Sequence, residues 1–132
     1  MNIMERPRLL LIDDEPALAA FVAEAADHCG YEAEIADGDD SFRSLFAADR
    51  PALVAIDLGM PGSDGVELLR FLSAEQFKGP VLIISGFDRR VLDSAFRLGE
   101  ALALHMVGPL EKPTRLALLE EILTDLRPGL TR

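Results

Sequence analysis

The chain has 132 residues, of which 49% are hydrophobic and 27% charged, a composition typical of one globular domain. Its formal net charge of −10 argues against direct binding to nucleic acid, whose phosphates would repel it. We expect no membrane insertion, because no apolar run approaches the ~20 residues of a membrane span and the first residues lack a signal peptide's apolar segment. The single cysteine, Cys29, cannot form an internal disulfide. This favours a reducing compartment and hence a cytoplasmic location.

Short apolar runs alternate with amphipathic stretches along the whole chain. Apolar runs closed by Gly, Pro or acidic residues predict buried strands, and apolar residues spaced by three and four predict helices packed on one side. The expected order is strand 8–12, helix 16–29, strand 32–36, helix 39–48, strand 53–57, helix 65–76, strand 81–84, a helix from about residue 88, strand 106–110, and a helix from about residue 114 to 127.

Two of the expected strands differ from the other three. Residues 32–36 alternate strictly, which predicts an edge strand with one exposed face, and residues 106–110 contain Pro109, which also belongs at an edge. In the last two helices, Val91 and Leu116 are assigned to the inward sides. Five strand–helix units in series predict an α/β fold, a doubly wound, flavodoxin-like parallel sheet of five strands in the order 2-1-3-4-5.

Polar side chains stand at the carboxyl ends of four expected strands. They are Asp13 with Asp14, Asp57, Ser85 and Lys112. Because parallel strands all end at the same edge of a sheet, these side chains should converge. Three carboxylates against one ammonium leave an excess of negative charge that a divalent cation would balance, and Mg²⁺ suits such oxygen ligands. Each residue alone has an ordinary explanation as a turn or surface residue, but their coincidence at one edge favours a phosphoryl-transfer site.

With these residues in place, the chain resembles the receiver domain of two-component response regulators over essentially its whole length. Any single matching motif is weak, but their combination in this order is highly specific. The motifs are LIDDEP at 11–16, IDLGMPGSDG at 56–65, ISG at 84–86 and LEKP at 110–113.

The resemblance implies that Asp57 accepts a phosphoryl group from a phosphohistidine. The donor would be a sensor histidine kinase or a histidine phosphotransfer protein. Asp14, Asp57 and the backbone carbonyl of Gly59 would bind Mg²⁺ directly, while Asp13 would help through water. The chain would catalyse its own phosphorylation and dephosphorylation, but no metabolic reaction.

Further roles follow from the same resemblance. Ser85 and Lys112 would hold the phosphoryl oxygens, and the peptide bond between Lys112 and Pro113 would be cis. Gly59 and Phe87 would tune how readily water attacks the acyl phosphate. Phosphorylation would shift the face built from the fourth helix, the fifth strand and the fifth helix, where an effector protein would dock.

The sequence departs from the family pattern in the fifth strand. An aromatic switch residue is expected three positions before the lysine, where this chain has Pro109. The segment 99–110 is also longer than usual, which predicts an extended fourth helix or an altered loop. We expect the output face to respond through the packing of Met106, Val107 and Leu110 instead.

The sequence leaves two other functions open. Pro109 favours a receiver-shaped adaptor whose interactions do not depend on phosphate, although the complete acidic set argues against it. A Mg²⁺-dependent phosphatase with an aspartyl nucleophile commonly has a second Asp two positions after the first, where this chain has Gly59.

The expected domain organisation is a single receiver domain over residues 1–132. Its core spans about residues 7–127, and residues 128–132 form a tail or a linker stub. The protein would then act alone, like the chemotaxis regulators, or be cut from a longer parent.

Overall fold

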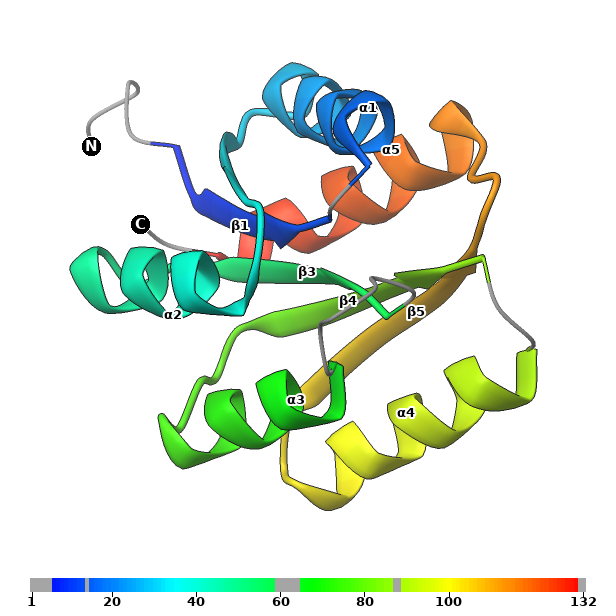
Figure 1. Ribbon diagram of the computed structural model, residues 1–132. Coiled ribbons are helices and arrows are strands. Elements are labelled where there is room, and N and C mark those ends of the chain that lie inside the picture. Colours follow the sequence, from blue (N-terminus) through cyan, green and yellow to red (C-terminus); the bar gives the residue numbers. More distant parts are fainter. Residues whose placement is uncertain (1–5, 14, 59–64, 87–88, 131–132) are drawn as a thin grey trace.

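The computed structural model describes residues 6–13, 15–58, 65–86 and 89–130. These residues form a five-stranded sheet and its flanking helices (Figure 1). The strands are β1 (Arg8–Ile12), β2 (Glu32–Ala36), β3 (Leu53–Asp57), β4 (Pro80–Ser85) and β5 (His105–Glu111). The helices are α1 (Pro16–His28), α2 (Asp39–Ala48), α3 (Gly65–Ala74), α4 (Arg89–Ala101), α5 (Leu116–Leu126) and a short 3-10 helix, η1 (Arg127–Gly129).

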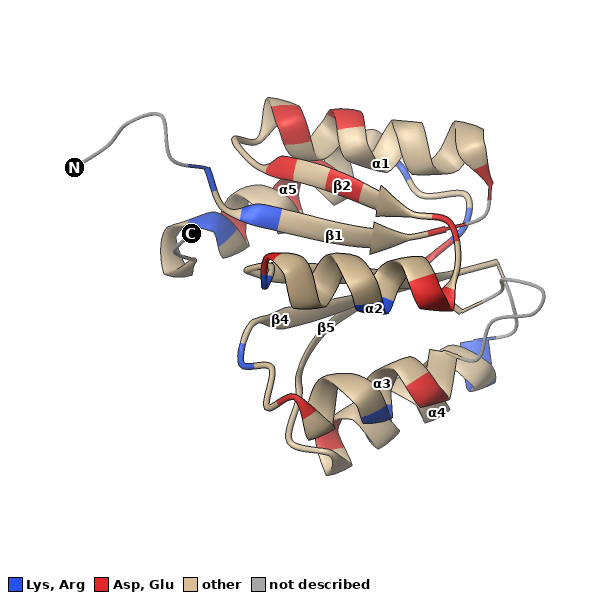
Figure 2. Cartoon of the chain, turned by 60° about the vertical axis from the view of Figure 1, so that its left-hand side comes forward, with Lys and Arg blue, Asp and Glu red and all other residues tan. Residues whose placement is uncertain are grey.

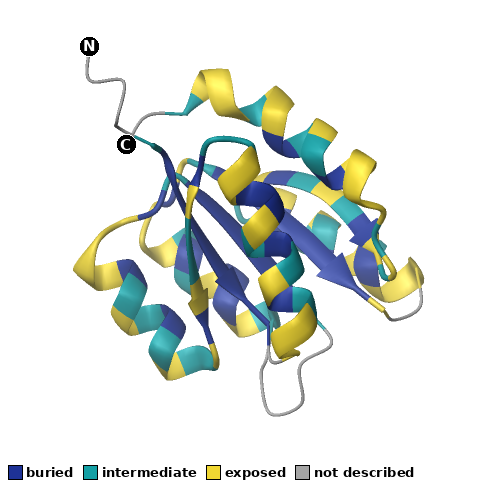
Figure 3. Ribbon diagram, turned by 90° about the horizontal axis from the view of Figure 1, so that it is seen from above, coloured by how far each residue is buried: buried dark blue, intermediate teal, exposed yellow. Residues whose placement is uncertain are grey.

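The sheet has the order β2-β1-β3-β4-β5, and every neighbouring pair is parallel. This confirms the predicted doubly wound fold. The three mainly apolar strands, β1, β3 and β4, are buried along their full length, whereas β2 and β5 form the edges. Figure 3 shows the contrast between the buried central strands and the helices with their exposed outer sides.

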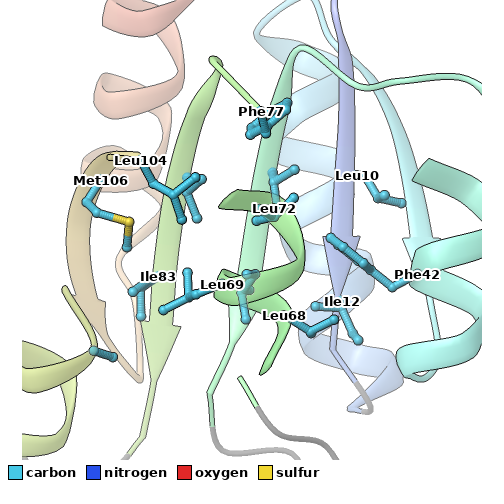
Figure 4. Packing of buried hydrophobic residues seen from close by; sticks show 14 of the residues in the cluster. Leu10, Ile12, Phe42, Leu68, Leu69, Leu72, Phe77, Ile83, Leu104 and Met106 are labelled. Carbon is cyan, nitrogen blue, oxygen red and sulfur yellow. The ribbon is translucent and has the colours of Figure 1, made fainter. Parts of the chain in front are cut away.

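Two hydrophobic clusters cover the two faces of the sheet. One joins side chains of β1, β3, β4 and β5 to α2, α3 and α4, with Phe42, Leu69 and Met106 among its members (Figure 4). The other joins the opposite faces of the same strands to α1 and α5, through residues such as Val22 and Leu119. The result is three layers, with α1 and α5 on one side and α2, α3 and α4 on the other (Figure 1).

Two apolar residues do not lie where the sequence pattern assigned them. Val91 and Leu116 are 48% and 46% exposed, so their predicted inward positions are wrong. Leu92 is buried; it lies one residue further and thus about 100° around the helix. Leu116 opens α5, outside the buried stripe of that helix. Ile35 is 41% exposed because β2 has no strand beyond it to complete its cover.

Strand β5 contains an irregularity that the sequence analysis did not place. Leu82 pairs with Val107, but Ile84 pairs with Leu110, so β5 has one residue more than β4 over this interval. The additional length lies at Gly108, which has a φ of +94°, and Pro109, joined by a cis peptide bond. The sequence leaves two alternatives for residues 99–110, an extended fourth helix or an altered loop; helix α4 ends at Ala101 and the irregularity lies in β5.

This bulge changes which face the end of β5 presents. In a regular strand Met106 and Leu110 would share a face, since side chains alternate with a period of two. In this chain Met106 packs in the cluster under α3 and α4, whereas Leu110 joins Val107 in the cluster under α1 and α5. The bulge therefore sets the orientation of the residues that lead into Lys112.

Candidate functional site

The carboxyl ends of β1, β3, β4 and β5 meet at one edge of the sheet. Asp57 closes β3 and Ser85 closes β4, where each pairs with the neighbouring strand. The backbone N–H of Lys112 donates to the carbonyl of Ser85 at 2.9 Å, which fixes the end of β5 beside β4. Asp13, Asp57 and Ser85 are all buried, with exposed fractions of 4%, 2% and 0%. Acidic segments directly follow the tips of β1 and β2 (Figure 2).

Lys112 connects two carboxylates at this edge. Its Nζ lies 2.9 Å from Oδ2 of Asp57 and 2.7 Å from Oε1 of Glu15. Hydrogen bonds between ionised groups at such distances are strong. Burial by itself would lower the pKa of Lys112, but the hydrogen bonds to Glu15 and Asp57 outweigh it and raise the pKa above its usual value. Lys112 is therefore held in its charged form.

Asp13 is a buried carboxylate at the site with a raised pKa. Its Oδ1 accepts a hydrogen bond from the backbone N–H of Glu15 at 2.9 Å. Burial is the largest effect and raises the pKa of Asp13 from 3.8 to about 6; the Glu15 N–H opposes this rise and the Asp57 carboxylate adds to it. The carboxylates of Asp13, Glu15 and Asp57 thus lie together beside the one ammonium group of Lys112.

Carboxylate oxygens of three residues lie within reach of a single cation. Oxygen atoms of Asp13, Glu15 and Asp57, one from each residue, all lie within 4.8 Å of one another. A set made only of carboxylate oxygens suits a hard divalent ion such as Mg²⁺. The donor set at this edge therefore fits the metal that the sequence pattern predicted.

Two glycines lie close to the site residues. A Cβ on Gly65, the first residue of α3, would lie only 2.4 Å from Cδ2 of Leu58, which directly follows Asp57. Glycine thus lets α3 begin against the end of β3. A Cβ on Gly86 would make an ordinary contact of 3.6 Å with Cδ of Lys112, so the aliphatic part of that lysine passes beside residue 86.

The structure brings together Asp13, Asp57, Ser85 and Lys112 of the predicted site. The peptide bond between Lys112 and Pro113 is cis. The other predicted site residues, Asp14, Gly59 and Phe87, lie outside the described residues.

Glu15 is a site residue to which the sequence analysis gave no role. Its carboxylate contacts Lys112 and belongs to the oxygen cluster, although its side chain is 62% exposed. The signal that could have found it is its place in the chain. It lies two residues after Asp13 and directly before Pro16, where α1 begins. Its backbone must therefore pass along the same edge of the sheet as the other acidic residues.

A cavity of about 660 Å³ lies at the opposite edge of the sheet. Residues at the amino ends of β3, β4 and β5 line it, among them Ala52, Pro80 and His105, together with Leu126 and Leu130 from the end of the chain. It is separate from the acidic site, so the chemistry at the carboxyl edge does not involve it.

Comparison with known proteins gives the family of the chain. The family model described as "Response regulator receiver domain" matches residues 9–124. The chain belongs to this family of receiver domains, which are signalling modules of two-component systems.

Individual relatives agree with this assignment. The transcriptional regulatory protein TrcR of Mycobacterium tuberculosis is 31% identical over 125 residues, covering 95% of this chain and 45% of that protein. The nitrogen assimilation regulatory protein NtrX of Azorhizobium caulinodans is 39% identical over 80 residues, covering 59% of this chain and 18% of that protein. The chain thus spans less than half the length of these curated relatives.

The fold is shared with solved receiver domains. A Francisella response regulator receiver domain superposes with a TM-score of 0.79 at 23% identity, covering 94% of this chain and 98% of that one.

In the part of the chain that the structure describes, every helix is too short or too polar to cross a lipid bilayer.

Proposed function

We propose that this chain is a phosphoacceptor module in which Asp57 takes a phosphoryl group from a phosphohistidine. The donor is a sensor histidine kinase or a histidine phosphotransfer protein, as the family implies. The observation that supports this most is the arrangement around the Asp57 carboxylate. It is 2% exposed, bonds to Lys112 at 2.9 Å, and lies within 4.8 Å of oxygens from Asp13 and Glu15.

The reaction needs a nucleophile and positive charge at the same place. An oxygen of Asp57 attacks phosphorus and forms an O–P bond, and the electron pair of the broken P–N bond returns to the imidazole of the donor. Lys112, held charged, stabilises negative charge on the phosphoryl oxygens, and Ser85 supplies a hydroxyl at the same edge. Water reverses the modification by attacking phosphorus, and the Asp57 carboxylate leaves.

We assign the Mg²⁺ site to Asp13, Asp14, Asp57 and the carbonyl of Gly59. The oxygen cluster that includes Asp13 and Asp57 supports this assignment, as does the Asp57 carboxylate, whose charge adds to the burial that raises the pKa of Asp13. When bound, the ion would neutralise carboxylates and phosphoryl oxygens and so lower the barrier to transfer. Gly59 and Phe87 remain our candidates for tuning hydrolysis.

We further propose that phosphorylation shifts the face formed by α4, β5 and α5. Arg89 of α4 pairs with Glu111 of β5 at 2.9 Å, directly beside Lys112 in the chain. The exposed apolar residues Val91 and Leu116 lie on α4 and α5, where an effector protein could bury them. A change at Lys112 would reach this face through the packing of the strand that contains Met106, Val107 and Leu110.

Hydrogen exchange tests the proposed response. Amides of residues 86–112 should change in protection when a phosphoryl mimic such as beryllofluoride is added with Mg²⁺. Identical protection with and without the mimic would contradict a conformational response.

A phosphate-independent adaptor is the second candidate, because Pro109 and its bulge occupy the place of the expected aromatic residue. Incubation with acetyl phosphate and Mg²⁺ distinguishes the phosphoacceptor from the adaptor. The phosphoacceptor gains the mass of one phosphoryl group, and Asp57→Asn does not; the adaptor gains none. A phosphatase would instead turn over a generic phosphomonoester, which we do not expect.

We also propose a cytoplasmic location, consistent with a single cysteine and a kinase partner.

We propose that residues 1–132 form one receiver domain with its core over about residues 7–127. Residues Arg127–Gly129 form η1, and the half-buried Leu130 packs against the cluster under α1 and α5. The start of the proposed tail or linker is therefore docked on the domain.

A further inference from the structure

We propose that Glu15 is a positioning residue that competes with the phosphoryl group for Lys112. This inference rests on the proposed phosphorylation of Asp57. Lys112 contacts Glu15 at 2.7 Å and Asp57 at 2.9 Å, so the cation that should stabilise the phosphoryl oxygens is shared with a second carboxylate.

The backbone holds Glu15 in place from two sides. Its N–H donates to Oδ1 of Asp13 at 2.9 Å, and its carbonyl accepts the N–H of Ala19 at 2.9 Å in the first turn of α1. Its backbone is extended, with φ −94° and ψ 103°, immediately before Pro16. The Glu15 side chain therefore leaves α1 at its amino end and reaches Lys112, which lies 97 residues further along the chain.

The two partners of this ion pair differ in freedom. The side chain of Lys112 is 15% exposed, whereas that of Glu15 is 62% exposed. An ammonium group has three hydrogens to donate, and Glu15 and Asp57 already engage two of them. A phosphoryl group on Asp57 brings further negative charge close to the Glu15 carboxylate. Glu15 then repels the phosphoryl oxygens and at the same time keeps Lys112 hydrogen-bonded to itself. Glu15 can swing into solvent to relieve this conflict, but Lys112 cannot move far.

Replacing the Glu15 carboxylate by a neutral group of the same shape should therefore favour phosphorylation. We expect Glu15→Gln to be phosphorylated by acetyl phosphate about two- to fivefold faster than the wild type, the range that one exposed ion pair allows. Because ions screen exposed charges, the difference should shrink as salt is raised. Glu15→Asp, which keeps the charge, should lie closer to the wild type.

The matched control is Glu24→Gln, which removes the same charge from an exposed position of α1, the helix that Glu15 directly precedes. It should be phosphorylated at the wild-type rate, as followed by intact-mass spectrometry. Magnesium affinity is measured in parallel by calorimetry, since the chain has no tryptophan to report binding. Because Glu15 belongs to the oxygen cluster, the phosphorylation rates of Glu15→Gln and Glu24→Gln are compared at Mg²⁺ concentrations that saturate each variant, so that the difference reports the competition for Lys112.

Two outcomes would overturn the inference. One is equal phosphorylation rates for Glu15→Gln and Glu24→Gln. The other is slower phosphorylation of Glu15→Gln with weakened Mg²⁺ binding, which would make Glu15 a ligand of the cation. Failure of the proposed function itself looks different, because the wild type would then gain no phosphoryl mass at all.

Discussion

At the scale of single residues, the site combines buried charge with incomplete neutralisation. Asp13 shows this most clearly, because its pKa is raised to about 6 by burial and by the neighbouring Asp57. The folded protein thus binds a proton at Asp13 more tightly than the unfolded chain does. The stability linked to this residue is full below about pH 4 and is lost as the pH rises from about 4 to 6.

Asp13→Asn should therefore stabilise the protein when magnesium is withheld. At about pH 7 we expect a gain of about 1–3 kcal/mol in the free energy of unfolding, since the amide removes a buried charge that Asp57 also repels, while its oxygen still accepts the Glu15 N–H. Urea unfolding in the presence of EDTA measures this gain in the free energy of unfolding. The control is Asp125→Asn, a substitution at an exposed position. An Asp13→Asn variant no more stable than that control would contradict the electrostatic account.

Tyr31 is a second buried ionisable residue, far from the site chemistry. It is fully buried, and its hydroxyl donates to the carbonyl of Leu123 in α5 at 2.7 Å. Burial, with a smaller contribution from Cys29, raises the pKa of Tyr31 to about 12, although Arg127 opposes the rise. The unfolded chain ionises first, so this stability is full below about pH 10 and is lost as the pH rises through about 12.

Tyr31→Phe should lose about 1 kcal/mol of stability at neutral pH, because the Leu123 carbonyl is left without its partner. Above about pH 10 the variant should lose less stability than the wild type, since it has no phenol to ionise. Urea unfolding as a function of pH measures both effects. Parallel pH profiles for the two proteins would contradict the assignment.

At the scale of elements, sequence patterns predicted most of the fold. The residues of β1, β2, β3 and α2 were predicted to the residue, because apolar runs and turn residues mark their ends clearly. The exposure of Val91 and Leu116 was missed, because spacing alone does not say how far the sheet extends beneath a helix. The bulge in β5 was missed because it depends on pairing with β4, which is not a local property of the sequence.

The bulge gives a direct prediction for Gly108. Its φ of +94° disfavours any L side chain, and an added Cβ would lie 3.1 Å from Leu82 and 3.2 Å from the backbone of residue 110. Gly108→Ala should therefore destabilise the protein by about 1–3 kcal/mol. Gly129→Ala, whose Cβ would meet nothing within 4 Å, is the matched control and should be nearly neutral. Equal urea midpoints for the two variants would show that the bulge tolerates a side chain.

The candidate site was predictable in outline for the same reason as the sheet. Parallel strands end at one edge, so Asp13, Asp57, Ser85 and Lys112 had to meet there. The role of Glu15 was not predictable, since it depends on the direction in which one exposed side chain leaves the first turn of α1. A sequence pattern locates such a residue but not the partner that it contacts.

At the scale of the whole molecule, acidic charge gathers at the functional edge of a chain with a net charge of −10. A cation that binds only the folded state stabilises it by mass action. Magnesium should therefore raise the unfolding temperature of the wild type, and raise that of Asp57→Asn less, because one carboxylate ligand is lost. Calcium-free buffers that contain sodium at matched ionic strength control for general screening of charge. An equal rise in the unfolding temperatures of the wild type and Asp57→Asn would argue against magnesium binding at this site.

The most direct test of the central claim is the mass of the intact protein after incubation with acetyl phosphate and Mg²⁺. We predict that the wild type gains one phosphoryl group and that Asp57→Asn, folded to the same extent by circular dichroism, gains none. No mass gain in the wild type, or an equal gain in both proteins, would contradict the assignment of Asp57 as the phosphoacceptor.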